Sequence, residues 1–225
     1  KLKYLLQKSM KKIVIFGSGC HAKVVFSEII KLKKYKFIGF VDNFAPKKKI
    51  ILKYKNKNYL NLGNIKQLKN LKKVYGIIGV GSSTLRNKIY EEINVVYKDF
   101  KFESIISKDS IIDPSVKIGN GSIIISNSVI NRDSIIGNHC LINTSTSIDH
   151  DNYFDDFSGT GPGVVTGGKV SVGKLSYIGI GSTIKNMVKI GKNTFIGGSS
   201  FVNKNCKNDS LYFGIPAKKI RNIKK

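Results

Sequence analysis

The sequence predicts a small α/β domain with a parallel sheet, followed by a three-sided parallel β-helix. Two observations lead to this prediction. In the N-terminal third, apolar strands are followed by glycine turns and amphipathic helical segments, which is the pattern of a parallel sheet. From residue 111 to residue 206 the chain divides into sixteen consecutive hexads without an insertion, and fourteen of them have a large apolar second residue. Such a strict short repeat is typical of a solenoid, whose units bury their apolar faces against one another.

The first strand of the α/β domain is expected at residues 12–16 and its first helix at residues 20–30. Gly17, Ser18 and Gly19 form the turn between them, and the backbone N–H groups at such a turn bind anions. Because the third glycine of the dinucleotide fingerprint is absent, the turn is a weak signal for NAD. The alternative is that the glycines serve only the tight turn.

A second strand at residues 37–41 ends at Asp42, which would lie at the carboxyl edge of the sheet, where open parallel sheets bind their ligands. A third strand at residues 74–79 leads through another glycine turn into a helix at residues 84–96, with Arg86 in its first turn. The domain therefore offers two neighbouring strand–glycine–helix turns. Together they favour an anionic ligand such as a nucleotide.

The segment between the second and third strands is rich in lysine. Residues 47–58 alternate Lys with Ile, Leu and Tyr and predict a solvated hairpin, and residues 65–71 predict a short helix. We therefore place a Rossmann-like nucleotide-sugar-binding domain at residues 11–103 and the β-helix with its C-terminal tail at residues 104–225. Residues 1–9 are interpreted as an extension upstream of the natural start.

Each hexad of the β-helix supplies one short strand and one corner. The apolar second residue points inward, and the Gly, Asn or Asp that often follows it allows the chain to turn. Three hexads close a triangle of 18 residues. Successive triangles pair their strands in parallel about 4.8 Å apart. The hexads therefore give a little over five coils.

Composition and charge narrow the function classes. With 39 basic and 14 acidic residues the formal charge is +25, which raises a nucleic-acid hypothesis. However, 36 of the basic residues are Lys, whereas nucleic-acid readers favour the Arg fork, so we expect no nucleic-acid partner. No apolar run has the length of a membrane span. Three widely spaced cysteines are typical of reduced thiols in a cytoplasmic protein, and Cys140 and Cys206 fall at the sixth place of their hexads, where Ser recurs.

The most distinctive polar cluster of the β-helix is Asp149–His150–Asp151. His150 is the fourth residue of its hexad and should lie at a corner, exposed or at a subunit contact, between two carboxylates. Either carboxylate can hold the imidazole in one tautomer and raise its basicity, which suits a general base. One coil further, Gly168 would offer a backbone N–H beside the imidazole for an oxyanion. The residues alone equally allow a surface histidine with incidental acids.

A zinc site is not supported by the hexad region. A three-histidine zinc site between solenoid coils needs a third ligand, and only His139 and His150 lie there. His139, at the fifth place of its hexad, is interpreted as structural. We therefore expect no metal.

Taken together, these motifs resemble those of the hexapeptide-repeat acyltransferases. The resemblance rests on the hexads, on Asp149–His150–Asp151, on Gly-Ile-Pro-Ala-Lys at residues 214–218, and on Ile-Phe-Gly-Ser-Gly-Cys-His-Ala-Lys-Val-Val at residues 15–25. The glycine–histidine–lysine motif narrows the resemblance to one branch, which contains the sialic acid O-acetyltransferases and the nucleotide-amino-sugar N-acetyltransferases of bacillosamine and perosamine synthesis. The resemblance covers nearly all of the chain from Met10 onward.

The resemblance implies a left-handed parallel β-helix, a homotrimer, and acetyl-CoA as the acyl donor in the groove between neighbouring subunits. It implies that His150 is the general base, assisted by Asp151, and that the amine or hydroxyl of the sugar gives its proton to His150 as it attacks the thioester. It also assigns ligand contacts: Asn143 and Thr144 near the acceptor sugar, Gly168, Gly179 and Gly181 along the pantetheine arm, Lys218 at the phosphates of CoA, and Gly17, Ser18, Gly19 and Asp42 at the nucleotide of the acceptor.

Two positions depart from the family pattern. Cys20 stands where members often have Gly, and Gly159 stands where many carry a second histidine, which leaves the substrate or the rate open. The expected function is acetyl-CoA-dependent N-acetylation of a nucleotide-activated amino sugar in surface glycan biosynthesis. The alternatives are O-acetylation of a sialic-acid-like sugar and a non-catalytic trimer that binds sugar nucleotides as a scaffold.

Overall fold

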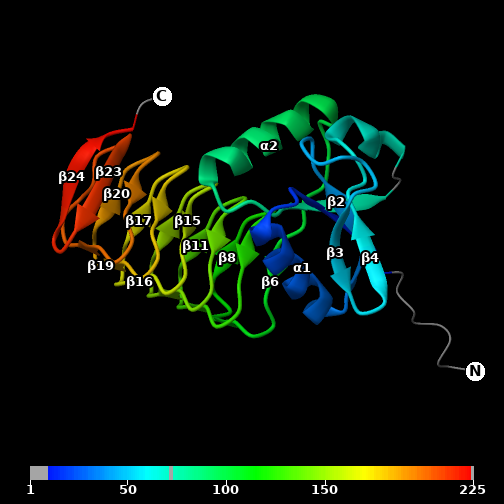
Figure 1. Cartoon of the computed structure of the whole chain (residues 1–225). Helices are drawn as coiled ribbons and strands as arrows, with labels where there is room; N and C mark the ends of the chain where they lie inside the picture. The colour runs from blue at the N-terminus through cyan, green and yellow to red at the C-terminus, as the bar shows by residue number, and fades with distance from the viewer. Residues whose placement is uncertain (1–9, 71–72, 224–225) are drawn as a thin grey trace, which may run out of the picture.

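The structure is a computed structural model that describes residues 10–70 and 73–223, with an α/β domain seated against one end of a β-helix (Figure 1). The interpretation of residues 1–9 as an extension lies outside the described residues. The predicted fold class is confirmed, because a small parallel sheet with helices precedes a parallel β-helix. No helix of the described part of the chain has the length and apolar content needed to cross a bilayer.

The α/β domain is built on a three-stranded parallel sheet in the order β2–β1–β5. The elements are β1 (Lys11–Phe16), α1 (Cys20–Leu32), β2 (Tyr35–Val41), β3 (Ile50–Tyr54), β4 (Lys57–Leu60), the 3₁₀ helix η2 (Ile65–Asn70), β5 (Val74–Ile78) and α2 (Ser83–Val96). The lysine-rich segment forms the expected hairpin, since β3 pairs only with β4 in an antiparallel ladder.

Alternate residues of β1 point to opposite faces of the sheet, so its apolar run supplies two cores. Ile13 and Ile15 pack against α1 on one face, whereas Val14 and Phe16 pack against α2 on the other. The α1 core continues into outward side chains of the first β-helix coils, such as Leu141. Helix α1 therefore lies between the sheet and the β-helix, and this apolar contact joins the two parts of the molecule (Figure 1).

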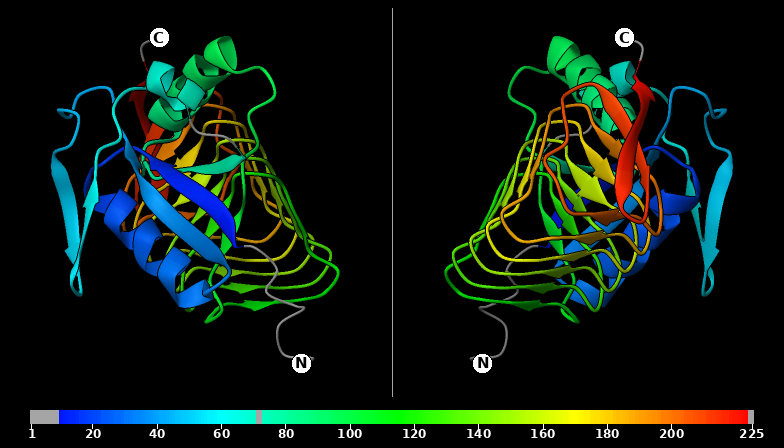
Figure 2. Two further views of the ribbon diagram at one scale, coloured as in Figure 1. Left: turned by 90° about the vertical axis from the view of Figure 1, so that its right-hand side faces the viewer. Right: turned by 90° about the vertical axis from the view of Figure 1, so that its left-hand side faces the viewer.

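The β-helix has three flat faces and a triangular cross-section (Figure 2). The six-stranded face contains β7 (Ile111–Ile112), β10 (Val129–Ile130), β13 (Ser147–Ile148), β16 (Val165–Thr166), β19 (Thr183–Ile184) and β22 (Phe201–Val202). The five-stranded face contains β8 (Lys117–Ile118), β11 (Ile135–Ile136), β14 (Tyr153–Phe154), β17 (Ser171–Val172) and β20 (Lys189–Ile190). The eight-stranded face contains β6 (Ile105–Ile106), β9 (Ile123–Ile124), β12 (Leu141–Ile142), β15 (Gly159–Thr160), β18 (Tyr177–Ile178), β21 (Phe195–Ile196), β23 (Ser210–Gly214) and β24 (Ala217–Asn222).

The coils keep the predicted 18-residue register over most of the β-helix. Ile130, for example, pairs with Ile148 one coil later. The second residue of each hexad points inward, and most of these side chains join one buried core of Ile, Val and Phe, to which the buried Thr160 and Thr166 add hydroxyl groups. The first strand of the β-helix, β6, lies one hexad before the counted repeats, and its Ile105 and Ile106 pair with β9. Ile105 and Ile106, which precede the first counted hexad, thus already belong to the first coil.

The last coil corrects the predicted hexad count. Ile190 pairs with Cys206, which is 16 residues away, so the last coil is two residues short. Cys206 is therefore buried in the inner core and does not occupy a sixth place. The strict count would turn Asn208 inward, and burying an unpaired amide is unfavourable. Beyond this coil, β23 continues the eight-stranded face and β24 folds back on it antiparallel.

Candidate active site

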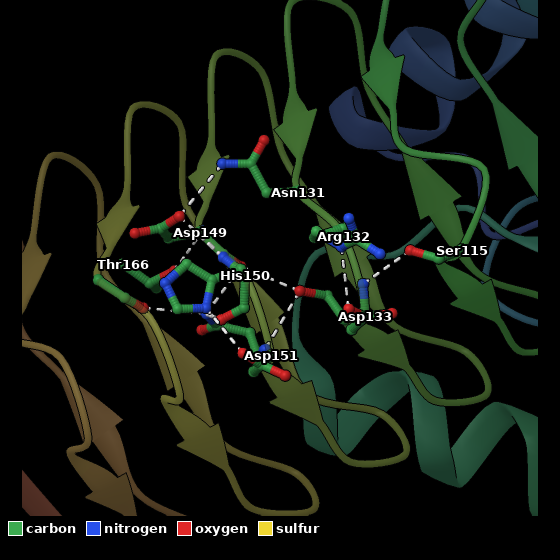
Figure 3. Close-up of polar contacts among 11 residues, drawn as sticks. Ser115, Asn131, Arg132, Asp133, Asp149, His150, Asp151 and Thr166 are labelled. Atoms are coloured by element: carbon green, nitrogen blue, oxygen red, sulfur yellow. Dashed lines mark hydrogen bonds and ion pairs between the residues drawn. The ribbon is translucent and has the colours of Figure 1, made fainter.

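The residues predicted to be catalytic lie at the corner between the six-stranded and the five-stranded face, which we call the histidine edge (Figure 3). This edge is formed by the corner residues that follow β7, β10, β13, β16 and β19. His150 follows β13, and 50% of its side-chain surface is exposed. The predicted exposed corner position of His150 is therefore confirmed.

The two carboxylates beside His150 have different partners (Figure 3). Asp151 Oδ2 lies 2.7 Å from His150 Nδ1. Asp149 Oδ1 instead accepts hydrogen bonds from the backbone N–H of His150 at 2.8 Å and from the side-chain amide of Asn131 at 3.2 Å, and both bonds lower the pKa of Asp149. In the tautomer that donates Nδ1–H to Asp151, His150 Nε2 carries the lone pair that a general base needs.

Gly168 lies one coil beyond His150, directly beside the imidazole. A Cβ added at this glycine would lie 2.6 Å from His150 Cε1 and 2.7 Å from His150 Nε2. The imidazole therefore rests on a glycine backbone that leaves no room for a side chain. This position explains in physical terms why the histidine edge needs glycine here.

Replacing Gly168 by alanine is expected to displace the imidazole while leaving the fold intact. The atoms that the new methyl group would meet belong to a mobile, half-exposed side chain, so the ring can move aside at little cost in stability. A shift of about 1 Å in a catalytic group can cost about 10²-fold in rate. Steady-state kinetics and thermal unfolding check this prediction together: kcat should fall and Tm should stay unchanged. An unchanged kcat would contradict it.

The residues predicted to meet the acceptor sugar lie on another edge, together with two of the three glycines predicted along the pantetheine arm, whereas the third of these glycines, Gly168, lies beside His150. Between the eight-stranded and the six-stranded face, the corners after β12 and β18 carry Asn143, Thr144, Gly179 and Gly181. We call this corner the asparagine edge. Within one protomer the structure does not bring these residues together with His150, although both edges border the six-stranded face. Lys218 is exposed on β24, at the opposite end of the β-helix from the α/β domain (Figure 1).

The predicted nucleotide contacts lie together at a cavity of about 340 Å³, whose lining includes Gly17, Ser18, Gly19 and Asp42. Ser18 Oγ donates to Asp42 Oδ2 at 2.6 Å, and the backbone N–H of Phe44 donates to Asp42 Oδ1 at 2.8 Å. The cavity lies at the carboxyl edge of the sheet, beside the amino ends of α1 and α2. Its volume is within the range of small-molecule sites.

Two further residues of this cavity were missed as site residues in the sequence. Cys20 is exposed at the start of α1, and His21 follows it in the first turn. His21 Nε2 is buried and has no hydrogen-bond partner among the described residues. Burial lowers the pKa of His21 to about 4, so the ring is neutral. The signal was available, because both residues directly follow the glycine turn that was assigned to the nucleotide.

Arg86 corrects the expectation of two free anion-binding turns. Its side chain is only 1% exposed, and its guanidinium donates to main-chain carbonyl oxygens, including those of Gly81 and His139. Burial lowers the pKa of Arg86 to about 10. The fork of this residue is therefore occupied within the protein. It carries positive charge near the cavity, but its N–H groups do not point into an open anion site.

His139 lies at the third edge, between the five-stranded and the eight-stranded face, and its position supports the structural interpretation. Its ring stacks on Phe157 of the next coil, with centroids 5.0 Å apart, and touches Tyr90 of α2. Burial, helped by the nearby Arg86 charge and opposed by Asp156, lowers the pKa of His139 to about 4. Within residues 10–70 and 73–223, no cluster of three His, Cys, Asp or Glu side chains is placed to hold a metal ion.

Acid should destabilise the protein through its two buried histidines. The pKa values of His21 and His139 are about 4 in the fold and 6.5 when unperturbed. Between these values the unfolded chain binds more protons than the folded one, so the free energy of unfolding falls as the pH is lowered from 6.5 towards 4. When the free energy of unfolding is measured in urea across this pH range, it should therefore change less steeply with pH for His139→Phe than for the unmodified protein. Equal slopes would contradict the prediction. Phenylalanine is tolerable at this corner, because Phe157 occupies the same place one coil later with the same positive φ.

Gly159, where a second histidine was expected, lies on the eight-stranded face under the α/β domain. A Cβ added there would lie 3.2 Å from Arg86 Nη2 and 3.1 Å from the carbonyl oxygen of Leu141. The position is buried and belongs to neither the histidine edge nor its neighbouring residues. A histidine at this place would thus face Arg86, and within one protomer it would lie on a different face from His150.

The fold of this chain is shared by proteins of known structure. Residues 12–93 match the family model described as the PglD N-terminal domain. The whole structure is similar to a mutant of the perosamine N-acetyltransferase from Caulobacter crescentus in complex with CoA and GDP-perosamine. The TM-score is 0.85, the identity is 27%, and the match covers 94% of this chain and 97% of that chain.

Two other solved structures share the architecture. The acetyltransferase domain of PglB from Neisseria gonorrhoeae has a TM-score of 0.84 and 25% identity, with coverage of 93% of this chain and 100% of that chain. WeeI from Acinetobacter baumannii has a TM-score of 0.80 and 20% identity, with coverage of 92% and 99%. At the latter identity only the fold is comparable. All three matches extend over both the α/β domain and the β-helix.

Proposed function

We propose that this chain belongs to the branch of the hexapeptide-repeat acyltransferases that contains the nucleotide-amino-sugar N-acetyltransferases, and that it acetylates the amine of a nucleotide-activated amino sugar. It is an acetyl-CoA-dependent sugar acetyltransferase, in keeping with its likeness to the perosamine N-acetyltransferase and to the acetyltransferase domain of PglB. The observation that carries the proposal is the pair formed by His150 and Asp151, 2.7 Å apart on an exposed edge. This pair supplies a general base that is oriented by a carboxylate.

In the proposed reaction, His150 Nε2 takes a proton from the sugar amine as the amine nitrogen attacks the thioester carbonyl carbon. Asp151 holds Nδ1–H and stabilises the imidazolium that forms. The tetrahedral intermediate then collapses, the C–S bond breaks, and the sulfur leaves as a thiolate that accepts the proton from His150. The backbone N–H of Gly168, beside the imidazole, is the proposed donor to the oxyanion. The products are the acetamido sugar and free CoA.

We propose that the working form is a homotrimer. His150 and Asn143 lie on opposite borders of the six-stranded face, so a neighbouring subunit can bring one edge against the other and complete the site. Exposed apolar side chains lie along this face and its borders and would be covered by such a contact; these are Ile111, Val165, Ile180 and Met187. Within this trimer the pantetheine arm would run along Gly179 and Gly181, with the CoA phosphates near Lys218.

Two domains share the work in this proposal. Residues 11–103 bind the nucleotide of the acceptor at the 340 Å³ cavity, and residues 104–225 carry the transfer chemistry. The cavity favours a nucleotide-linked acceptor over a free sialic acid, because two helix amino ends border it. The free, buried thiols of Cys140 and Cys206 support a cytoplasmic location, where acetyl-CoA is available.

Release of free CoA tests the function directly. The purified protein is supplied with acetyl-CoA and a panel of UDP- and GDP-linked amino sugars and of free sialic acids, and the products are identified by mass spectrometry. N-acetylation of one nucleotide-linked amino sugar is the expected result. Turnover with sialic acid alone would instead assign O-acetylation. Thermal stabilisation by nucleotide sugars without any turnover would assign a binding scaffold.

A further inference from the structure

Arg86 is a buried cation that the proposed mechanism does not use. Its side chain is 1% exposed, and within residues 10–70 and 73–223 it forms no ion pair. Burying an unpaired charge is a poor way to gain stability, because the lost hydration must be replaced by hydrogen bonds. The role of Arg86 therefore depends on the main-chain carbonyl oxygens to which its guanidinium donates.

The guanidinium joins one turn of the α/β domain to two successive coils of the β-helix. Towards the domain, Nη1 donates to the carbonyl oxygens of Val80 at 3.1 Å and Gly81 at 2.7 Å. Towards the β-helix, Nε donates to the carbonyl oxygen of His139 at 3.0 Å, and Nη2 donates to that of Phe157 at 3.0 Å and of the next residue at 3.1 Å. A planar fork with this many bonds fixes direction as well as distance.

The turn that Arg86 holds is a wall of the nucleotide cavity. Val80 and Gly81 line it, together with the first glycine turn. The two turns touch, since a Cβ added at Gly17 would lie 2.8 Å from Val80 Cγ2. Contacts therefore run without a gap from the β-helix coils through Arg86 and Val80 to the glycine turn that would hold the nucleotide. Gly159 leaves the space beside Nη2 open for this arrangement.

Arg86 is one of several contacts that attach the domain to the β-helix. The apolar contact of α1 with the first coils already joins the two parts. A second polar link lies on the same side, where Ser126 Oγ donates to the buried Glu28 Oε1 at 2.7 Å. This second link does not touch the cavity. Helix α1 joins the two parts, whereas the guanidinium of Arg86 donates to the turn at Val80 and Gly81. Arg86 therefore fixes the position of this cavity wall relative to the β-helix.

We infer that Arg86 is a positioning residue, which sets the nucleotide cavity at a fixed place along the β-helix and thereby makes acetyl transfer depend on the nucleotide half of the acceptor. This inference rests on the proposed function. A nucleotide held in a fixed place presents the amine of its sugar at one distance from the cavity, and only an acceptor of matching length reaches the base. The residue acts through Val80 and Gly81 and does not itself touch the substrate.

Arg86→Lys and Arg86→Met test the inference, with Ser126→Ala as the matched control. We measure kcat/KM for a nucleotide-linked amino sugar and for the same free amino sugar, KM for acetyl-CoA, and hydrogen exchange of residues 79–83 in the unliganded protein. Both Arg86 variants should lose about 10²-fold in kcat/KM for the linked sugar only, the size expected of a misplacement remote from the chemistry. They should also exchange faster at residues 79–83. Lysine keeps the charge and can still donate to a carbonyl oxygen, but it cannot form the planar fork.

The control and the two readouts separate the possible outcomes. Ser126→Ala removes a partly buried link between the same two parts, and it should leave the ratio between linked and free sugar unchanged. An equal fall for both sugars, an equal effect of Ser126→Ala, or unchanged exchange at residues 79–83 would each overturn the positioning role. If the unmodified protein acetylates no nucleotide-linked sugar while the Arg86 variants still exchange faster, the proposed function fails and the structural part of the inference stands.

Discussion

Replacing His150 by alanine is expected to lower kcat by about 10²–10⁴-fold, which is the usual contribution of a positioned general base. The imidazole is half exposed, and its ring hydrogen-bonds to the half-exposed Asp151, so its removal leaves that carboxylate in contact with water. We therefore expect Tm to stay unchanged. The dissociation constant of acetyl-CoA, measured by calorimetry, should also stay within error, because binding and proton transfer use different groups.

Asp151→Asn is the matched control for this prediction. The backbone of Asp151 has φ +56°, a conformation that asparagine tolerates well, so the corner is preserved. An amide can still contact Nδ1, but it no longer stabilises an imidazolium by charge. The fall in kcat should be smaller than for His150→Ala and should appear with no change in acetyl-CoA binding. Full activity in His150→Ala would remove the imidazole from the mechanism.

Replacing Phe154 by alanine should give the largest loss of stability among single changes in the β-helix. Phe154 is fully buried at the inward place of β14, and its partners in the ladder are Ile136 and Val172. A buried Phe→Ala change costs about 3–5 kcal/mol, since the coil backbone cannot collapse into the vacated space. The free energy of unfolding of globular domains is about 5–15 kcal/mol, so the variant should lose a large part of it.

Urea unfolding measures this loss, and Lys189→Ala serves as its control. Lys189 lies on the same face, in β20, and points outward beside the inward Ile190. Its replacement should change the free energy of unfolding by no more than about 0.5 kcal/mol, as is usual for exposed positions. A Phe154→Ala protein as stable as the control would mean that the inward column does not hold the coils together.

The β-helix was predictable because its information is local. Each hexad contains its own inward residue and its own corner, so the sequence can be read without knowing which segments meet. The exposed corner position of His150 followed from the same count, as the fourth place of a hexad. The strand–glycine–helix turns were likewise local, and they led to Gly17 and Asp42 at one cavity.

The parts that sequence reasoning missed depend on contacts between distant segments. Arg86 in a first helical turn after glycine is typical of an anion site, and only packing against His139 and Phe157 shows that its fork is already occupied. The two-residue shortening of the last coil is similar, because the choice between Cys206 and Asn208 as the inward residue is decided by burial. No count along the chain reveals either outcome.

The antiparallel return of β24 has a consequence for solubility. A parallel ladder that simply stopped would leave free N–H and C=O groups, onto which the coils of another molecule could stack and grow into a filament. On the eight-stranded face, the final edge belongs to β24, which runs antiparallel to the coils and carries the exposed Lys218, Lys219 and Arg221. The positive charges on two such strands repel each other, and the antiparallel direction of β24 does not fit a further parallel coil. Both features oppose stacking of another molecule on this face.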